Sequence, residues 1–315
     1  MKRQKLRLII PVFNEEENIA LLAHELNQIL PKLQEYQSEV IWVDDGSTDR
    51  SWERLVNLEF PHNRIRLNRN YGQSTAIMAG LDCIDSGLVI TLDGDLQNDP
   101  SDIPSLLLAY EERNCIVLTY RETRKDHLIR RVPSKLANMF ARKITGVDIK
   151  DFGCTLKLFR KEDVAGLRLN GEMHRLLSFY LVKNSNKFIQ IPNNHRPRLF
   201  GVSKYGLGRT FKFIADLLLA MTLDQVKSRP IYFFGKFSSY IFTAGIIMSA
   251  SALVLYLLNV KEYFDTTLVV GGLIMMAAAV ILLSIGLITD LLIRTLTQVY
   301  PGLHYIVQES LFGKP

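Results

Sequence analysis

The 315-residue sequence contains few cysteines: Cys83, Cys115 and Cys154 are scattered, odd in number and show no paired spacing typical of a zinc site. This pattern argues against a disulfide framework and suits a reducing cytosolic compartment. The basic residues 1–5 are followed by an apolar run that is too short and is broken by Pro11, so we expect no signal peptide.

Apolar residues are abundant, making up 48% of the chain, and the excess lies toward the C-terminus. Residues 237–258 and 268–289 form two nearly uncharged runs of roughly 22 residues, each long enough to cross a bilayer. The short polar link between them requires a helical hairpin with both ends on one side. Basic residues flank the hairpin, so the positive-inside rule predicts that the large N-terminal part and the C-terminal tail are cytoplasmic.

The formal net charge is +6. A basic chain can bind nucleic acid, anionic lipid or a polyanionic substrate. With two predicted membrane spans, lipid headgroups and phosphates are the more economical partners, and we expect no nucleic acid partner.

The N-terminal part repeats a unit of one strand followed by one helix. Four strands are predicted at residues 6–11, 39–43, 64–67 and 88–92. The first three precede amphipathic or alanine-rich segments, and the fourth precedes a turn and a proline that can open a helix. Such repeats predict an α/β fold, with a parallel sheet covered by helices on both faces. The polar loops that follow these strands would then share one edge of the sheet, where ligands bind in such folds.

Two carboxylates flank a glycine directly after the fourth predicted strand, in Asp93-Gly94-Asp95. This turn is small enough for both side chains to approach one divalent cation, which would in turn hold a diphosphate. Taken alone, the pattern is more often an Asp-rich turn without a ligand. The motifs around it favour the functional interpretation.

Four ordered motifs carry a family resemblance, at residues 10–15 (IPVFNE), 43–49 (VDDGSTD), 70–73 (NYGQ) and 93–97 (DGDLQ). Together they resemble a family 2 glycosyltransferase of the GT-A fold. Further motifs narrow the subgroup, at residues 151–154, 171–175, 195–198 and 201–206. These resemble the polyprenyl-phosphate glycosyltransferases, which include bactoprenol glucosyltransferases, dolichyl-phosphate mannose synthases and the aminoarabinose transferases of lipid A modification.

The resemblance implies a GT-A domain, Rossmann-like with a mostly parallel sheet, in residues 1–207. Residues 208–229 carry an apolar stripe with basic flanks, which predicts an amphipathic helix in the headgroup plane or, alternatively, one packed on the catalytic domain. Two transmembrane helices are expected in residues 230–293 and a cytoplasmic tail in residues 294–315. The membrane would be the bacterial inner membrane, and relatives suggest a homo-oligomer.

Nucleotide binding is assigned by the resemblance to Pro11, Phe13, Glu15, Asp44 and Asp45. Carboxylates at the ends of neighbouring strands can accept hydrogen bonds from a nucleobase N–H and from ribose hydroxyls. Asp45 is the strongest candidate, followed by Glu15. Asp44, like Asp49, is equally consistent with a role in capping the following helix.

The resemblance also implies a divalent cation, Mg²⁺ or Mn²⁺. Asp93, Asp95 and Gln97 offer it oxygen ligands, and diphosphate oxygens and water would complete the coordination. The cation would neutralise the charge that builds on the departing nucleoside diphosphate. Asp93 either shares the cation or contacts the ribose or the sugar.

Residues 120–143 are rich in Arg and Lys. Such a run is ordinarily a solvated basic face. Because the expected acceptor is a lipid phosphate, we assign Arg121, Arg131 and Ser134 to that phosphate, which a planar guanidinium can bind in bidentate fashion. Arg196 and Lys204 are assigned to an acceptor loop that closes over the diphosphate.

The acceptor decides the mechanism that we expect. A phosphate monoester is already largely dianionic at neutral pH, so it needs no general base. We therefore expect direct attack on the anomeric carbon with inversion, with Asp93, Asp95 and Asp151 as the catalytic residues. Asp151 would orient acceptor and donor sugar. His174 and His195 invite a catalytic interpretation, but a lone histidine is more often structural.

The donor expected from the resemblance is a UDP-hexose such as UDP-glucose, followed by GDP-mannose or UDP-aminoarabinose. A processive polysaccharide synthase is an alternative, but such enzymes carry a Gln-x-x-Arg-Trp motif, and the two tryptophans here, Trp42 and Trp52, follow Ile41 and Ser51. A non-catalytic membrane scaffold is a further alternative. The intact acidic motifs argue against it.

Overall fold

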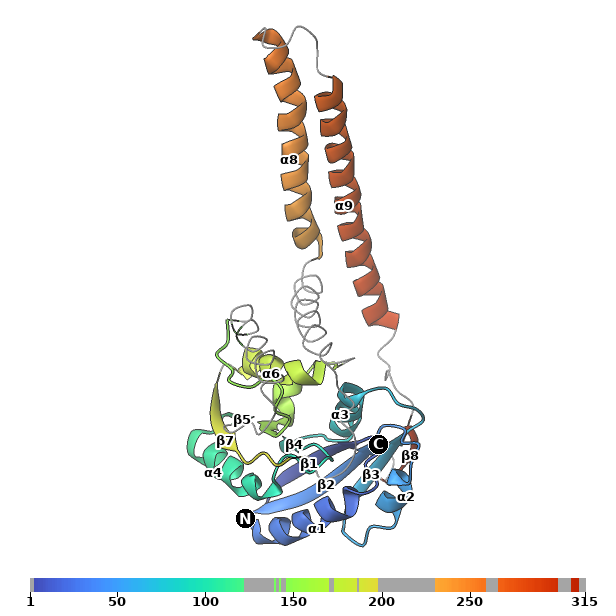
Figure 1. Ribbon diagram of the computed structural model, residues 1–315, viewed down its shortest axis with the longest axis vertical. Helices are drawn as coiled ribbons and strands as arrows, with labels where there is room; N and C mark the ends of the chain where they lie inside the picture. The colour runs from blue at the N-terminus through green and yellow to red at the C-terminus, as the bar shows by residue number, and fades with distance from the viewer. Residues whose placement is uncertain are drawn as a thin grey trace. The chain divides into compact units, whose positions relative to one another are not determined.

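The computed structural model describes residues 3–121, 139, 142, 146–169, 173–185, 187–197, 230–258, 266–299 and 307–311. The chain divides into two compact units. One comprises Met1–Leu217 with Leu303–Pro315, and the other comprises Leu218–Gly302. The first unit holds a β-sheet with its covering helices, and the second holds two long apolar helices (Figure 1).

The described part of the first unit contains an eight-stranded sheet in the order β7-β5-β6-β4-β1-β2-β3-β8. The strands are β1 (Gln4–Val12), β2 (Tyr36–Asp44), β3 (Asn63–Leu67), β4 (Leu88–Thr91), β5 (Ile116–Arg121), β6 (Lys157–Arg160), β7 (Phe188–Asn193) and β8 (Val307–Ser310). β1 pairs in parallel with β2 and β4, and β2 pairs in parallel with β3. The four predicted parallel strands are therefore confirmed. β6 runs antiparallel to β4 and β5, β7 is parallel to β5, and β8 is antiparallel to β3.

Four helices of this unit come after β1 to β4, as the sequence predicts, and a further helix, which was not predicted, precedes β7. They are α1 (Ile19–Ile29), α2 (Ser51–Val56), α3 (Gln73–Asp82), α4 (Ile103–Arg113) and α6 (Leu177–Ser185). Short 3₁₀ turns complete the described elements: η1 (Leu30–Lys32), η2 (Pro100–Asp102), η3 (Lys161–Val164) and η4 (Met173–Leu176).

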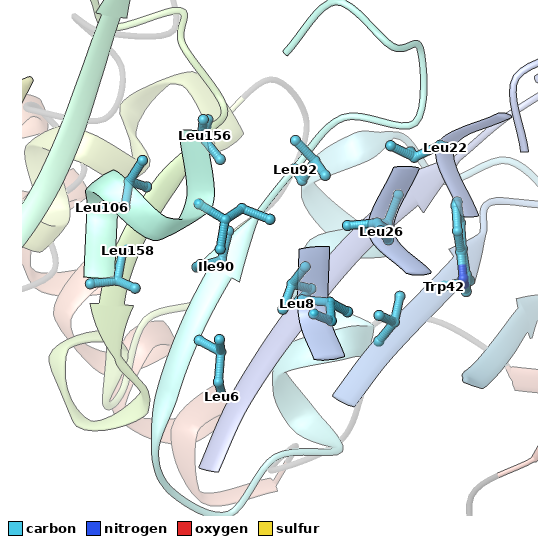
Figure 2. Packing of buried hydrophobic residues seen from close by; sticks show 14 of the residues in the cluster. Leu6, Leu8, Leu22, Leu26, Trp42, Ile90, Leu92, Leu106, Leu156 and Leu158 are labelled. Atoms are coloured by element: carbon cyan, nitrogen blue, oxygen red, sulfur yellow. The ribbon is translucent and has the colours of Figure 1, made fainter. Parts of the chain in front are cut away.

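The core forms because successive side chains of β1 point to opposite faces of the sheet. Leu6, Leu8 and Ile10 are fully buried against α1 and α4 on one face (Figure 2). Ile9 faces α3 on the other, where a Cβ on Gly80 would lie 2.6 Å from Ile9 Cγ2. Each such side chain contributes about 1.5–3 kcal/mol. This packing holds the carboxyl ends of β1, β2 and β4 at fixed positions.

The direction of β6 decides which loops meet at the functional edge. Because β6 is antiparallel to β4, its first residue, Lys157, pairs with Thr91 at the end of β4. The loop before β6 therefore reaches the same edge as the loop after β4. The polar loops after β1 and β2 end at this edge as well.

Strand β8 was not expected from the sequence, which suggested only a cytoplasmic tail there. Val307–Ser310 adds to the outer edge of β3, with Arg66 opposite Glu309 and Leu67 opposite Val307. All four β8 residues are exposed. The strand therefore lacks the alternation of buried and exposed residues by which sequence patterns reveal strands.

The second unit contains α8 (Pro230–Leu257) and α9 (Thr266–Val299), both longer than the apolar runs that predicted them. Their segments Ile231–Leu257 and Thr266–Leu292 each have 27 residues and are long and apolar enough to cross a membrane. Only 11% of the most apolar stretch of each is buried within the protein, unlike the core helix of a soluble protein. The helix expected at residues 208–229 lies outside the described residues.

Small residues form the contact between α8 and α9. A Cβ on Gly245 would lie 2.7 Å from the carbonyl oxygen of Gly272, and Ser238 Oγ donates a 2.7 Å hydrogen bond to the carbonyl of Ala279. Close backbone approach of this kind, together with interhelical hydrogen bonds, is how helices associate in lipid.

The turn after β2 provides a test of the fold at the functional edge. Gly46 has φ +68°, and an added Cβ would overlap the backbone of Arg69 and Asn70. We expect Gly46→Ala to destabilise the first unit by about 2–5 kcal/mol, from left-handed strain plus overpacking. Gly166 is a matched control, because it has φ +73° but nothing within 4 Å of its Cβ position. Gly166→Ala should cost only about 1–2 kcal/mol. Equal shifts in the thermal unfolding midpoint of the two variants would contradict this expectation.

Candidate active site

Asp93, two residues beyond β4, has both carboxylate oxygens held by side chains from other elements. Its Oδ1 accepts a 2.6 Å hydrogen bond from Gln73 Nε2 at the start of α3. Its Oδ2 accepts a 2.5 Å hydrogen bond from Thr155 Oγ1 in the loop before β6. The carboxylate is therefore oriented by two contacts, and each oxygen keeps further acceptor capacity.

Asp95 lies on the other side of Gly94 and is only 8% exposed. Its Oδ1 accepts a 3.1 Å hydrogen bond from the backbone N–H of Gln97. Burial and the neighbouring Asp95 charge raise the pKa of Asp93 to about 6. The proximity of a second carboxylate to buried Asp93 favours a bound cation that would offset the charge.

The donor set fits a hard divalent cation such as Mg²⁺ or Mn²⁺, because it consists of oxygen atoms. Within the described residues, no cluster of three or more His, Cys, Asp or Glu could hold a metal by itself. A cation bound by Asp93, Asp95 and Gln97 would therefore complete its coordination with water and the oxygens of a diphosphate. This is the arrangement predicted from the sequence, and the assignment of these ligands stays a prediction.

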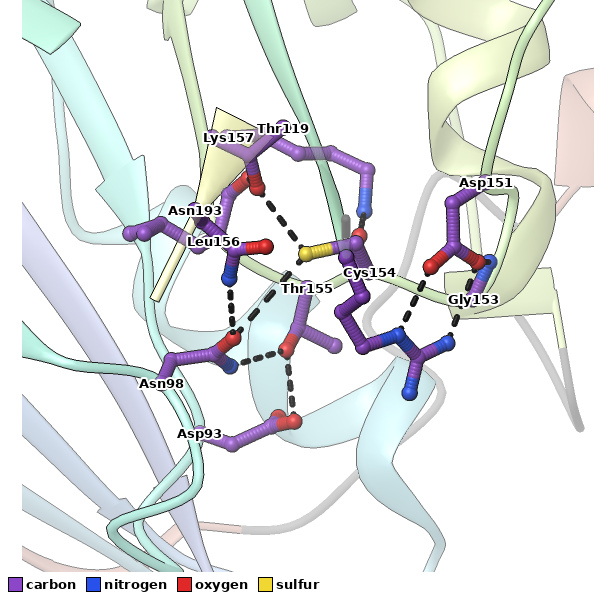
Figure 3. A network of polar contacts seen from close by, with 11 residues as sticks. Asp93, Asn98, Thr119, Asp151, Gly153, Cys154, Thr155, Leu156, Lys157 and Asn193 are labelled. Carbon is purple, nitrogen blue, oxygen red and sulfur yellow. Dashed lines mark hydrogen bonds and ion pairs between the residues drawn. The ribbon is translucent and has the colours of Figure 1, made fainter. Parts of the chain in front are cut away.

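A buried polar network continues from Thr155 into the sheet (Figure 3). Asn98 Nδ2 donates a 3.0 Å hydrogen bond to Thr155 Oγ1, and Asn193 Nδ2 donates a 3.0 Å hydrogen bond to Asn98 Oδ1. The network joins the loop after β4 to the loop before β6 and to the end of β7. Because these side chains are buried, each lost hydrogen bond would leave an unsatisfied polar group.

Arg121 and Asp151, which the sequence assigned to different tasks, form one bidentate ion pair. Arg121 Nε lies 2.7 Å from Asp151 Oδ2, and Arg121 Nη2 lies 3.0 Å from Oδ1. Asp151 is 5% exposed and also accepts a hydrogen bond from the backbone N–H of Gly153. The role of Arg121 in phosphate binding and that of Asp151 in substrate orientation stay predictions. The two side chains are in direct contact.

Sequence reasoning missed Lys157, which is 1% exposed at the start of β6. Its ammonium donates to the carbonyl of Cys154. Burial lowers its pKa, and the charges of Asp93 and Asp151 act in the opposite direction. It therefore brings a basic group into an acidic site.

Gln73, Thr155 and Asn98 were also missed as site residues. Each lies inside or next to a motif that the sequence revealed: Gln73 ends motif 70–73, Thr155 follows motif 151–154, and Asn98 follows motif 93–97. Adjacency to these motifs was the available signal.

Asp45 anchors one loop to another. It is 3% exposed, and its two oxygens accept 2.8 Å hydrogen bonds from the backbone N–H groups of Tyr71 and Gly72. Burial raises its pKa to about 6. Motif 70–73 is thus held beside motif 43–49, so any contact of Asp45 with a nucleoside would use its remaining acceptor capacity.

The neighbouring carboxylates have local roles. Asp44 is fully buried, accepts a 3.1 Å hydrogen bond from the backbone N–H of Ser47 and lies 3.5 Å from Arg66 Nε. Asp49 accepts a 2.9 Å hydrogen bond from the backbone N–H of Ser51 at the start of α2. Asp49 thus binds the first backbone N–H of α2 from the position before the N-cap, Arg50, whose own side chain makes no capping hydrogen bond, whereas Asp44 stabilises the turn and pairs with an arginine.

Pro11, Phe13 and Glu15 lie at the end of β1, beside the loop that follows β2. Pro11 pairs with Val43, and the backbone N–H of Glu15 donates a 2.8 Å hydrogen bond to Ser51 Oγ. Phe13 lines a pocket of about 380 Å³ that also receives residues from the loops after β2 and β3 and from β8. The structure brings these three predicted residues to one edge together with Asp44 and Asp45.

The acceptor loop is described only in part. The guanidinium of Arg196 lies 2.6 Å from Asp99 Oδ2 and 2.7 Å from Glu25 Oε1, and its backbone N–H donates a 2.8 Å hydrogen bond to the carbonyl of Gln97. Arg196 therefore adjoins a predicted metal ligand, but two carboxylates offset its charge. Its phosphate role stays a prediction. Arg131, Ser134 and Lys204 lie outside the described residues.

The two histidines that invited a catalytic interpretation, His174 and His195, have distinct surroundings. His174 is buried, its Nδ1 lies 3.1 Å from Ser74 Oγ, and its backbone N–H donates a 2.8 Å hydrogen bond to the same hydroxyl. Burial lowers the pKa of His174 to about 3, so the ring is neutral at physiological pH. His195 pairs with Asn98 in an isolated β-bridge.

Comparison with known proteins places these features in a family context. The family described as glycosyl transferase family 2 matches residues 8–167. Dodecaprenyl-phosphate galacturonate synthase of Rhizobium johnstonii is 34% identical over 321 residues, which cover 97% of this chain and 92% of that protein. Undecaprenyl-phosphate 4-deoxy-4-formamido-L-arabinose transferase of Photorhabdus laumondii is 36% identical over 260 residues, covering 81% and 78%.

Solved structures share the fold. Glucosyl-3-phosphoglycerate synthase from Mycobacterium tuberculosis, in complex with Mn²⁺, UDP and glucosyl-3-phosphoglycerate, superposes with a TM-score of 0.51 at 18% identity. The match covers 69% of this chain and 79% of that one. The expected GT-A fold is thereby confirmed.

The contact between Thr155 and Asp93 can be tested through metal binding. Thr155→Val removes the hydroxyl that orients Asp93 and leaves Asn98 without an acceptor, so we expect Mn²⁺ affinity in the presence of UDP to fall by roughly 10- to 100-fold. Thr155→Ser keeps the hydroxyl and should bind nearly as the wild type does. Calorimetric titration of both variants measures the effect. Wild-type affinity in Thr155→Val would contradict the positioning role.

The neutral His174 predicts a specific pH dependence of stability. Its pKa is about 3 in the folded chain and about 6.5 when unfolded, so its stabilising contribution is complete above pH 6.5 and is lost as the pH falls toward 3. At pH 5 the loss is about 2 kcal/mol. Thermal unfolding at pH 7.5 and pH 5 should show a smaller decrease for His174→Asn than for the wild type. An identical decrease would show that His174 does not titrate in this way.

Proposed function

Since this chain belongs to glycosyl transferase family 2, we propose that it transfers a sugar from a nucleoside diphosphate to the phosphate of a polyprenyl lipid. The observation that carries the proposal is the oriented Asp93–Asp95 pair, at the edge where the nucleoside loops end, in a chain with two helices able to cross a membrane. Two relatives whose names specify polyprenyl-phosphate acceptors support it, and one of them aligns with 97% of the chain.

In this proposal the donor lies along the carboxyl edge of the sheet. The nucleoside contacts Pro11, Phe13, Glu15, Asp44 and Asp45. The diphosphate reaches Asp93, Asp95 and Gln97, which would hold Mg²⁺ or Mn²⁺. That cation, when bound, neutralises charge on the departing nucleoside diphosphate. Gln73 and Thr155 keep Asp93 in place for the donor.

The acceptor phosphate is its own nucleophile. Its second pKa is near 6, so it is largely dianionic at neutral pH. One of its oxygens forms a bond to the anomeric carbon as the bond from that carbon to the diphosphate oxygen breaks, with inversion. Asp151 accepts hydrogen bonds from Arg121 and Gly153 and is almost fully buried, which supports a positioning role and not that of a base. Arg121, Arg131, Ser134, Arg196 and Lys204 are the proposed partners of the acceptor phosphate.

The names of the relatives change the order of the candidate donor sugars. The sequence resemblance favoured UDP-glucose, whereas the two relatives are named for galacturonate and for 4-deoxy-4-formamido-L-arabinose. We therefore rank UDP-linked galacturonate and formamidoarabinose ahead of glucose, with GDP-mannose last. A few hydrogen bonds to particular sugar hydroxyls decide such choices.

We also propose that both termini and the catalytic unit are cytoplasmic. α8 and α9 form a hairpin, and the chain on either side of it belongs to the first unit, since β8 pairs with β3. Basic residues near the hairpin ends support a cytoplasmic location for those ends, by the positive-inside rule. The proposed boundaries are 1–207 for the catalytic domain, 208–229 for the interfacial helix, 230–293 for the spans and 294–315 for the tail. Assembly into a homo-oligomer stays a prediction.

A transfer assay tests the proposal directly. Purified full-length protein is incubated with undecaprenyl phosphate and Mg²⁺ or Mn²⁺. The labelled donors are UDP-galacturonate, UDP-4-deoxy-4-formamido-L-arabinose, UDP-glucose and GDP-mannose. We expect labelled organic-extractable lipid from one donor, its loss with a chelator, and at least a roughly 100-fold decrease in Asp95→Asn, since direct ligands matter more than outer-shell residues.

Three other results of the transfer assay would contradict parts of the proposed function. Transfer that persists with chelator would refute the metal role of Asp95. Nucleotide-sugar binding without any labelled lipid would refute the lipid acceptor. A labelled polymer in place of a lipid would support the processive alternative.

A further inference from the structure

The pocket of about 380 Å³ in the first unit is built partly by the last strand of the chain. Its volume is within the range of about 300–1,000 Å³ that is typical of small-molecule sites. The proposed function puts the donor nucleobase at this edge, and we propose that Gln308 of β8, which forms one wall of the pocket, hydrogen-bonds to that base. This inference rests on the proposed function and adds a binding residue outside the family motifs.

The location of the pocket favours the donor over an unrelated ligand. Its lining includes Phe13 after β1, Ser47 after β2 and Asn70 after β3, so it opens where these three parallel strands end. Asn70 begins the motif whose backbone N–H groups bind Asp45 and whose last residue, Gln73, binds Asp93. One continuous loop therefore connects the pocket to the carboxylates proposed for the diphosphate.

The chemistry of the lining suits a planar heteroaromatic ring. Phe13 offers an aromatic surface for stacking, and Ser47, Asn68 and Gln308 offer hydrogen-bonding groups. The charge of Arg66 is partly offset, because it lies 3.5 Å from buried Asp44 and 5.5 Å from the Trp52 ring centre. Stacking surface and polar edges together are what a nucleobase requires.

The pairing of β8 explains how Gln308 reaches the pocket. Arg66 is opposite Glu309 and Leu67 is opposite Val307, so Gln308 is the extra residue at a break in register. Such a β-bulge re-aims a side chain and is common next to active sites. The flanking hydrogen bond from Leu311 N–H to the Arg64 carbonyl, 3.0 Å long, keeps the strand in place.

β8 contributes no buried side chain, so packing in the core does not account for the choice of residue at position 308. Ser310, two residues after Gln308 in β8, pairs with Ile65 of β3 and does not line the pocket. Ser310→Ala is therefore a matched control for any effect of changing β8 itself.

The test measures nucleotide binding by full-length protein in detergent with Mn²⁺. We expect Gln308→Ala to weaken UDP binding by roughly 3- to 10-fold, as for one lost hydrogen bond. Gln308→Trp, which fills the pocket, should weaken it further. Because the lost contact is to the base, UMP binding should weaken by the same factor. Ser310→Ala should bind both nucleotides as the wild type does.

The outcomes separate this inference from the proposed function. If the wild type binds UDP and transfers sugar but both Gln308 variants bind UDP normally, the inference is wrong and the function stands. If Gln308→Ala weakens UDP but not UMP binding, Gln308 acts at the diphosphate, and the nucleobase assignment is wrong. If the wild type binds neither UDP nor GDP, both the proposed function and the inference are wrong.

Discussion

The pairing of β4 with two neighbours of opposite direction is the constraint on which the site depends. β1 runs parallel to β4, so the loop after β1 lies at the carboxyl end of β4. β6 runs antiparallel to β4, so the loop before β6 lies at that same end. Asp93 therefore lies where α3 and the β6 loop can each supply a hydrogen-bond donor to one of its oxygens. An all-parallel arrangement would have sent the loop before β6 to the opposite edge, away from this carboxylate.

Charge is concentrated at this edge and largely compensated within it. Burial raises the pKa values of Asp45 and Asp93, while the basic side chains of buried Lys157 and half-buried Arg121 lie in the same acidic region. Burying ion pairs seldom adds stability, because the desolvation cost can exceed the attraction. A function in binding explains their presence better, since a site that brings a diphosphate and a second phosphate together must offset the repulsion between the two anions.

The two units differ in what holds them together. The first is stabilised by apolar side chains packed on both faces of a sheet, whereas the second relies on small residues and hydrogen bonds between α8 and α9. The second mode suits lipid, where burial of apolar surface gives no advantage. The chain returns from α9 to form β8 on the sheet of the first unit, so the same polypeptide that carries the apolar hairpin also lines the pocket at the edge of β3.

The sequence by itself determined the features that local patterns encode: the four parallel strands, the acidic turn at Asp93 and Asp95, and the two apolar helices, because periodicity, turn residues and run length report directly on such elements. Only the tertiary structure decided which side chains meet. Thr155 reaches Asp93 across 62 residues of sequence, and Arg121 reaches Asp151 across 30. Strand β8 was also hidden, because an exposed strand has no buried face to leave a pattern. These contacts follow from strand direction and register, which act between distant segments and leave no local signal.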